Sequence, residues 1–416
     1  MIYASSSRRS AAGRCLRPLT VWTAVLALLA GATAPPALHA QARAVEQEGP
    51  SPEQVSSAIA GGLEWLHRNQ VKVGENQGYW DSPGYHTATA SFAGLAFLAN
   101  GHRPGKGRYG ETIVRAMNYV KASMTPEGYL GGKEDTMYAH AICTLFGLAY
   151  LGRSENPEEE VELANWCRKA IQLILRAQKV PKSADARGGW RYKYYSRESD
   201  LSVTSWQLLV LHAARQCGYD VPEEAFQNAM RYVNGAYLDE EAVERARQKT
   251  LDKEEMTPEE RKAAEARLAA KQGRAGFVYR RGVSREVEPA VTGVAVFLKS
   301  ILEEEPDEKT RKSLAFLETF SPAWGGKQYK GYFFFGTFYM VQGMFQVGGE
   351  NWKAFRPRIQ EILLDHQEGD GRWLAPEDNV PQSLDAGVAY STAMGVLILS
   401  VEKQYLPMYQ RVQRIY

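Results

Sequence analysis

Residues 177–190 read AQKVPKSADARGGW and contain the pattern that decides the fold, a glutamine that ends one helix and a Gly-Gly-Trp turn that precedes the next. The same unit recurs along the chain as an amphipathic helix, a turn of glycine with an aromatic residue, and an apolar helix rich in Ala, Gly and Thr. Its turns are Gly78-Tyr79-Trp80, Gly128-Tyr129-Leu130, Gly188-Gly189-Trp190, Gly276-Phe277-Val278, Trp324-Gly325-Gly326 and Gly371-Arg372-Trp373. Successive turns lie roughly 50 residues apart, a period typical of repeat architectures, except between the third and the fourth.

The two helices of each unit differ in how apolar residues are distributed around them. Residues 161–178 place apolar side chains three or four positions apart with charged residues between them, which predicts an amphipathic helix with one buried face and one solvent-exposed face. Residues 136–151, 203–217 and 386–401 are apolar nearly all round, so these helices must be enclosed on both sides. Six outer and six inner helices predict an all-α ring, an α6/α6 toroid. An open array of helical hairpins is the alternative.

The start of the chain has the order of a secretory signal peptide. Four arginines within residues 8–17 precede a mostly apolar run at 19–34, and small residues follow. We expect cleavage after Ala42, with Ala40 as the alternative, and hence a secreted or periplasmic protein. An uncleaved membrane anchor is the other interpretation, although the run is shorter than the ~20 apolar residues that a spanning helix needs.

Charge and cysteine content narrow the function classes. The 416 residues have a formal net charge of +2, and loss of residues 1–42 would remove four arginines and no acids, leaving about −2. A near-neutral chain argues against a nucleic-acid partner. Cys143, Cys167 and Cys217 remain, so at most one intrachain disulfide can form, and all three lie in helical patterns typical of small apolar core residues.

The rest of the chain divides into a linker, one domain and an insertion. Residues 43–51 are polar and lack periodicity, which predicts a mobile linker before a single domain at 52–416. The segment 239–273 is rich in Glu, Lys, Arg and Ala and is expected to form a solvated helical hairpin or extended helices that leave the ring.

The Gln…Gly-Gly-Trp units resemble the QW-type repeats of the prenyltransferase/squalene oxidase repeat superfamily, which includes protein prenyltransferase β subunits and squalene–hopene cyclases. The resemblance covers nearly the whole chain after the predicted leader. The segments at 200–207 (DLSVTSWQ), 137–140 (MYAH), 390–393 (YSTA) and 405–409 (YLPMY) are similar to secreted bacterial proteins of this repeat type whose activity is generally unassigned. The resemblance implies a toroid fold but says little about chemistry, because proteins with the same fold can carry different functional sites.

The catalytic motifs of these relatives are missing from the sequence. No D-x-D-D cluster of crowded carboxylates, the proton donor of hopene cyclases, occurs in the chain. The Asp-x-Cys zinc motif of prenyltransferases is replaced by Asp135-Thr136-Met137 or Asp200-Leu201-Ser202, whose thioether and hydroxyl are poor zinc ligands. The thioester motif G-C-G-E-Q is absent as well. We therefore expect no metal and no cofactor.

Candidate site residues lie near the predicted starts of the inner helices. His86, Arg197 and Asp200 are the catalytic candidates, and the candidates for ligand binding are Tyr85, Asp135, Tyr138, Trp206, Arg285, Tyr332 and Tyr339. Each has a structural interpretation too: Asp200 precedes a helix and fits an N-cap, and His86 can pack on Tyr85. The aromatic patch around Tyr332 and Tyr339 fits helix packing or carbocation binding.

These observations leave the function open between three classes. The leading hypothesis is a toroid whose cavity or mouth binds a ligand or a protein without the chemistry of the family. A secreted α/α-toroid enzyme that cleaves polysaccharides is the rival, and it needs Arg197, Asp200 and His86 close together. A divergent terpenoid cyclase or prenyltransferase is the third hypothesis, which a deep aromatic cavity would favour and a filled centre would exclude.

Overall fold

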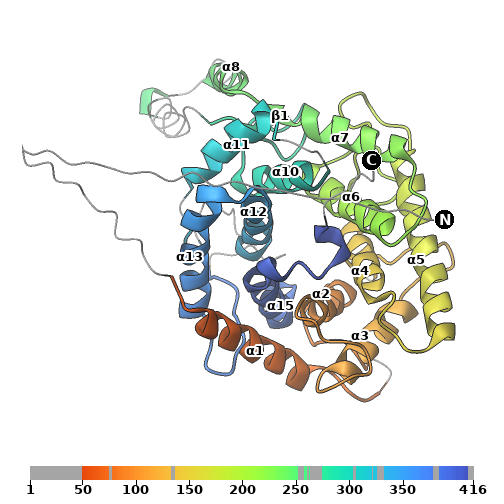
Figure 1. The fold of residues 1–416 in the computed structure, drawn as a ribbon. Helices are drawn as coiled ribbons and strands as arrows, with labels where there is room; N and C mark the ends of the chain where they lie inside the picture. The colour runs from red at the N-terminus through yellow and green to blue at the C-terminus, as the bar shows by residue number, and fades with distance from the viewer. Residues whose placement is uncertain are drawn as a thin grey trace, which may run out of the picture. The chain divides into compact units, whose positions relative to one another are not determined.

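The computed structural model describes residues 49–74, 77–132, 136–251, 257–259, 262, 274–302, 306–320, 322–325, 332–377 and 384–410. Within one compact unit, Gln47–Tyr416, the helices form two concentric rings (Figure 1). The inner helices are α2 (His86–Ala99), α4 (Met137–Tyr150), α6 (Leu201–Gln216), α10 (Pro289–Leu302), α12 (Phe333–Val347) and α15 (Gly387–Leu399). The outer helices are α1 (Pro52–Asn69), α3 (Gly110–Ala122), α5 (Pro157–Gln178), α7 (Glu223–Gly235), α11 (Glu308–Glu318) and α13 (Gly349–Asp365).

The inner ring closes on itself. Each inner helix contacts the next one along the chain, from α2 through α4, α6, α10, α12 and α15, and α15 then contacts α2. The predicted α6/α6 toroid is therefore confirmed. Closure explains the apolar composition of the inner helices, because each lies between two inner neighbours and an outer partner. In α2, every residue from Thr87 to Ala99 is buried.

The insertion contributes a feature that the all-α expectation did not include. Strand β1 (Tyr237–Leu238) pairs antiparallel with β2 (Gly276–Phe277), which joins the two ends of the inserted segment. Helix α8 (Glu240–Leu251) follows β1 with acidic residues in its first turn. Most of residues 252–273 lie outside the described residues, as do the predicted signal peptide at 1–42 and Asp135. No helix of the described residues is long and apolar enough to cross a membrane.

The glutamine that ends an outer helix binds two carbonyls at once. The Nε2 of Gln178 donates to Gly188 O and to Ala225 O, both at 2.9 Å. Gln70 makes the same pair of bonds to Gly78 O and Thr112 O. Ala225 and Thr112 lie in the first turn of the next outer helix, so each glutamine joins its own turn to the following unit.

The glycine and the tryptophan of the turn complete the same contact. Gly188 has φ 95°, and a Cβ there would lie 2.1 Å from Asn228 O, so the turn requires glycine. The indole Nε1 of Trp190 donates to Ile174 O in the last turn of α5 at 2.9 Å. Thr204 of α6 accepts a hydrogen bond from the backbone N–H of Trp190. One turn thus ties an outer helix, the next outer helix and an inner helix together.

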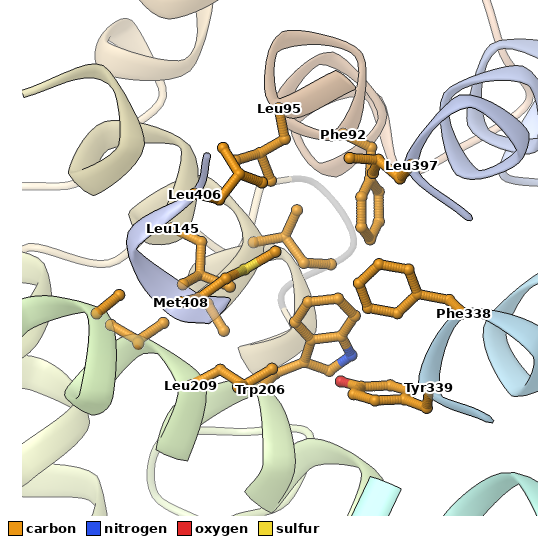
Figure 2. Close-up of a cluster of buried hydrophobic side chains, with 14 of the residues drawn as sticks. Phe92, Leu95, Leu145, Trp206, Leu209, Phe338, Tyr339, Leu397, Leu406 and Met408 are labelled. Carbon is orange, nitrogen blue, oxygen red and sulfur yellow. The ribbon is translucent and has the colours of Figure 1, made fainter. Parts of the chain in front are cut away.

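The C-terminal segment fills one end of the ring. Residues 401–410 contain the short helices η2 (Val401–Lys403) and η3 (Pro407–Tyr409), and Leu406 and Met408 are buried among the inner helices (Figure 2). Gln346 donates to Tyr409 O, and the ring of His212 is 2.5 Å from Gln410 O. We refer to residues 401–410 as the C-terminal plug.

Replacing Gln178 with alanine should lower the free energy of unfolding by about 2 kcal/mol, because two buried carbonyls lose their donor. Gln172→Ala on the exposed face of the same helix is the matched control, and it should change that free energy by less than about 0.5 kcal/mol. Urea unfolding followed by circular dichroism measures both. Equal losses in the two variants would contradict the joining role of Gln178.

The Leu406→Ala variant should lose about 2–5 kcal/mol of stability, since Leu406 is fully buried in the plug. The same substitution at Leu374, whose side chain is 40% exposed, serves as the control and should cost far less. Thermal and urea unfolding would show the difference. If Leu406→Ala behaved like Leu374→Ala, the plug would not be packed into the ring.

Candidate functional site

A cavity of about 700 Å³ opens at the end of the ring where the inner helices begin. Tyr85, Thr136, Tyr332 and Ala386 line it, and they are the N-cap residues of α2, α4, α12 and α15. Its other lining residues are Ala88, Thr89, Phe92, Tyr138, Ala139, Ile142, Tyr192, Lys193, Ser202, Trp206, Tyr279, Glu288, Ala290, Val291, Phe335 and Tyr390. The lining is rich in aromatic and small apolar side chains, as in ligand pockets generally.

An aromatic floor separates the cavity from the C-terminal plug. Trp206 stacks on Phe338 with ring centroids 5.9 Å apart and meets Phe92 edge to face at 5.6 Å. Figure 2 shows these three rings gathered with Leu406 and Met408, which belong to the plug. The centre of the toroid is therefore filled at one end and hollow at the other, so the cavity is blind.

Asp200 is fully buried at the start of α6, beside the cavity. Its Oδ1 accepts hydrogen bonds from Val203 N at 2.8 Å and from the Ser202 hydroxyl at 2.9 Å. Its Oδ2 lies 3.4 Å from Nη1 of Arg191. The expected N-cap is therefore confirmed. Burial raises the pKa of Asp200 to about 6, against the lowering by these hydrogen bonds and by Arg191.

Arg191 belongs to a charged group that continues away from the cavity. Its Nε lies 3.1 Å from Glu198, which also pairs with Arg280 at 2.9 Å. The guanidinium of Arg191 also lies over the ring of Tyr192, 4.7 Å from its centroid. These contacts fix the segment between the Gly-Gly-Trp turn and α6, and with it the position of Tyr192 in the cavity wall.

Two pairs of hydrogen-bonded hydroxyl groups lie in the cavity wall on the side of Asp200. The hydroxyl of Tyr138 is hydrogen-bonded to that of Ser202, whose own hydroxyl donates to Asp200. The hydroxyls of Tyr192 and Tyr279 are 2.5 Å apart. Of the two pairs, the one between Tyr138 and Ser202 leads to the carboxyl group of Asp200.

The structure separates the predicted site residues into two groups. Tyr85, Tyr138, Trp206 and Tyr332 line the cavity. Tyr339 lies beneath its floor, edge to face with Trp206 and hydrogen-bonded to Ser205. Asp135 lies outside the described residues.

The charged candidates among the described residues do not line the cavity. His86 binds Ser82 O through Nε2 at 2.8 Å and packs on Tyr79 rather than on Tyr85, and it is not among the described residues that line the cavity. Arg197 and Arg285 are exposed and are likewise not part of that lining. The cation beside Asp200 is Arg191, not Arg197.

Several residues of the site were not among the sequence candidates. Tyr192, Lys193 and Tyr279 line the cavity together with Glu288. Tyr192 and Lys193 begin the run Tyr192-Lys193-Tyr194-Tyr195, one residue beyond the Gly-Gly-Trp turn, and Tyr279 directly follows the turn Gly276-Phe277-Val278. Their places just after these two turns are the signal that could have identified them.

The remaining reactive groups do not add a second centre. Among the residues that the structure describes, no group of three His, Cys, Asp or Glu side chains could hold a metal ion. Cys143, Cys167 and Cys217 are not joined by a disulfide. Burial raises the pKa of Cys217 to about 11, which makes it a poor nucleophile. The ring of His140 accepts a hydrogen bond from Leu130 N and binds Ala170 O, so it is a core histidine with both ring nitrogens hydrogen-bonded.

No protein-family model matches the sequence, and no curated protein matches it. The fold is similar to that of type II terpene cyclase MstE from Scytonema, solved with geranylgeranyl dihydroxybenzoate, at a TM-score of 0.50 and 11% identity over 84% of this chain and 98% of that one. It is also similar to the GH76A alpha-1,6-mannanase of Salegentibacter sp. HEL1_6, solved with alpha-1,6-mannotriose, at a TM-score of 0.53 and 10% identity over 84% and 99%. At these identities the likeness establishes the α/α-toroid fold alone.

The raised pKa of Asp200 predicts how stability depends on pH. Between about pH 3.8 and pH 6 the folded state keeps a proton that the unfolded state has released, so this group makes the protein less stable as pH rises through that window. Asp200→Asn keeps an N-cap side chain but cannot titrate. The stability of the wild type relative to Asp200→Asn should therefore fall, by up to about 3 kcal/mol, between pH 4 and pH 7. Urea unfolding at both pH values measures it, and an unchanged or rising difference would contradict the raised pKa.

Proposed function

We propose that the protein is a secreted binding toroid whose blind cavity takes up a ligand with an apolar body and a hydroxyl-bearing end. The observation that carries this proposal is the aromatic cavity itself, closed below by Trp206 and Phe92 and bordered by polar groups at the starts of the inner helices. Its volume of about 700 Å³ is within the range of small-molecule sites. Secretion rests on the signal-peptide pattern of residues 1–42.

The distribution of polarity in the cavity supports an amphipathic ligand. Ile142, Val291 and several alanines line it together with the aromatic rings, so the transfer of an apolar body from water into the cavity would be favourable. The tyrosine hydroxyls, Ser202 and Thr136 supply hydrogen-bonding partners for a polar end. Geranylgeranyl dihydroxybenzoate, the ligand in the MstE structure, has such a division into an apolar chain and a hydroxylated ring.

The candidate catalytic groups favour binding over polysaccharide cleavage. Both oxygens of Asp200 face protein partners, Val203 N and Ser202 on one side and Arg191 on the other. Asp200 is fully buried and is not among the described lining residues, so it would act on a ligand only through other groups. His86 is held by Ser82 O and Tyr79. The expected constellation of His86, Arg197 and Asp200 thus has no support as a catalytic group.

Binding of farnesol to the purified protein tests the proposal, with alpha-1,6-mannotriose as the comparison. Isothermal titration calorimetry should detect farnesol and not the sugar. In Ala290→Trp the indole would occupy the cavity at the start of α10, and binding should be lost. Ala60→Trp on the exposed face of α1 is the matched control and should bind like the wild type.

The outcomes separate the hypotheses. Mannotriose binding that Ala290→Trp abolishes would favour a carbohydrate site and overturn the proposed ligand class. Farnesol binding that is equal in Ala290→Trp and Ala60→Trp would place the site outside the cavity and overturn the proposal.

A further inference from the structure

The tyrosine hydroxyls of the cavity wall differ in whether the protein itself uses them. The hydroxyl of Tyr138 is hydrogen-bonded to that of Ser202, and those of Tyr192 and Tyr279 are hydrogen-bonded to each other at 2.5 Å. These hydroxyls therefore already have a partner within the wall. Tyr390 of α15 lines the same cavity, and its hydroxyl has no hydrogen-bond partner among the residues that the structure describes.

The hydroxyl of Tyr390 keeps its proton at neutral pH. Burial raises the pKa of this hydroxyl above its ordinary value, and no hydrogen bond or neighbouring charge contributes to the rise. A neutral phenol has one O–H donor. Because no described residue accepts a hydrogen bond from it, this donor is available to a molecule in the cavity.

The ring of Tyr390 is held next to the closed end of the cavity. It meets Phe92 edge to face with ring centroids 5.5 Å apart, and it meets Phe334 in the same way at 6.5 Å. Phe92 also contacts Trp206 in the aromatic floor. The ring of Tyr390 therefore borders the floor, and its hydroxyl lies among aromatic groups.

Ring packing alone does not explain why residue 390 carries a hydroxyl. A phenylalanine there would make the same contacts with Phe92 and Phe334. An O–H group among aromatic rings without an acceptor loses the hydrogen bonds that it makes in water, which is unfavourable. An acceptor atom supplied by a bound ligand would restore such a bond.

We propose that Tyr390 determines specificity by donating a hydrogen bond to an oxygen atom on the enclosed part of the ligand. The ligand class is then an oxygenated apolar molecule, with a carbonyl, ether or hydroxyl oxygen within its body. This inference rests on the proposed function, since it adds a second polar atom to the ligand of the same cavity. A hydrocarbon group at this place would leave the donor of Tyr390 without a partner, and the cavity would discriminate against it.

The start of α15 also suits an acceptor oxygen. Its N-cap residue, Ala386, lines the cavity and makes no side-chain capping bond. The first N–H groups of a helix have no partner within the helix, and they favour an oxygen atom nearby over a donor group. The wall formed by α15 is therefore better matched to an acceptor on the ligand than to a donor.

Two probes that differ in one group test the inference. Benzophenone has a carbonyl between its two phenyl rings, where diphenylmethane has a methylene group. The Kd of diphenylmethane divided by that of benzophenone should be about fivefold higher for the wild type than for Tyr390→Phe, which is the size of one ordinary hydrogen bond. Because this ratio is compared between two proteins, the different hydration of the two probes cancels. Titration calorimetry measures all four constants.

Two control variants distinguish ligand recognition from a structural role. Tyr332→Phe removes another cavity hydroxyl, on a residue that is 41% exposed, and it should keep the wild-type ratio. Tyr390→Phe should unfold in urea with the free energy of the wild type, since its hydroxyl has no protein partner to lose. Tyr138→Phe loses the hydrogen bond to Ser202 and should be less stable.

The results separate this inference from the proposed function. Equal ratios for the wild type and Tyr390→Phe, or failure of benzophenone to bind where farnesol binds, would overturn the inference and leave the binding cavity in place. A loss of stability in Tyr390→Phe as large as that in Tyr138→Phe would assign the hydroxyl to the fold and would also overturn it. If neither probe nor farnesol bound, the proposed function would fail, and this inference with it.

Discussion

The double hydrogen bond of each turn glutamine is the interaction on which the ring depends. Gln70, Gln178 and Gln367 each donate from Nε2 to the glycine carbonyl of their own turn and to a carbonyl of a neighbouring outer helix. For Gln367 that neighbour is α1, the first helix of the ring, so the last unit is joined to the first. The same kind of hydrogen bond therefore joins successive units and closes the ring. Because the ring is closed, the wholly apolar inner helices are enclosed on all sides.

The same turns position the site, because each leads the chain from the outside of the ring to the start of an inner helix. Trp190 is anchored to Ile174 O, and its backbone forms a bridge with Asp200 at the beginning of α6. The residues between them, including Arg191 and Tyr192, are held in a short loop at the mouth of the cavity. Tyr279 occupies the corresponding place after the turn at Gly276-Phe277-Val278, in the next unit along the chain. Two successive turns of the repeat thus place tyrosines in the wall of the cavity.

The sequence predicts the ring well and the site only in part, and the physical reason is the range of the contacts involved. Helix type follows from local periodicity, and the capping role of Asp200 follows from its neighbours along the chain, so both were predictable. The partner of Asp200 is Arg191 and not the nearer Arg197, which depends on how the loop folds back. The pairing of Tyr138 with Ser202 joins two inner helices, and the C-terminal plug fills the ring from the far end of the chain. No local pattern encodes contacts of this kind.

The two sides of the cavity mouth differ in polarity, and this difference argues for a hydroxyl group rather than an ammonium group on the ligand. On one side, α4 and α6 begin with side-chain caps from Thr136 and Asp200. On the other side, the N-cap residues of α2, α12 and α15 form no side-chain capping bond, so backbone N–H groups and the positive ends of three helix dipoles border the cavity. An ammonium would be disfavoured by the second side. A hydroxyl can accept hydrogen bonds from N–H groups there and can also donate one, so it suits the proposed polar end of the ligand better.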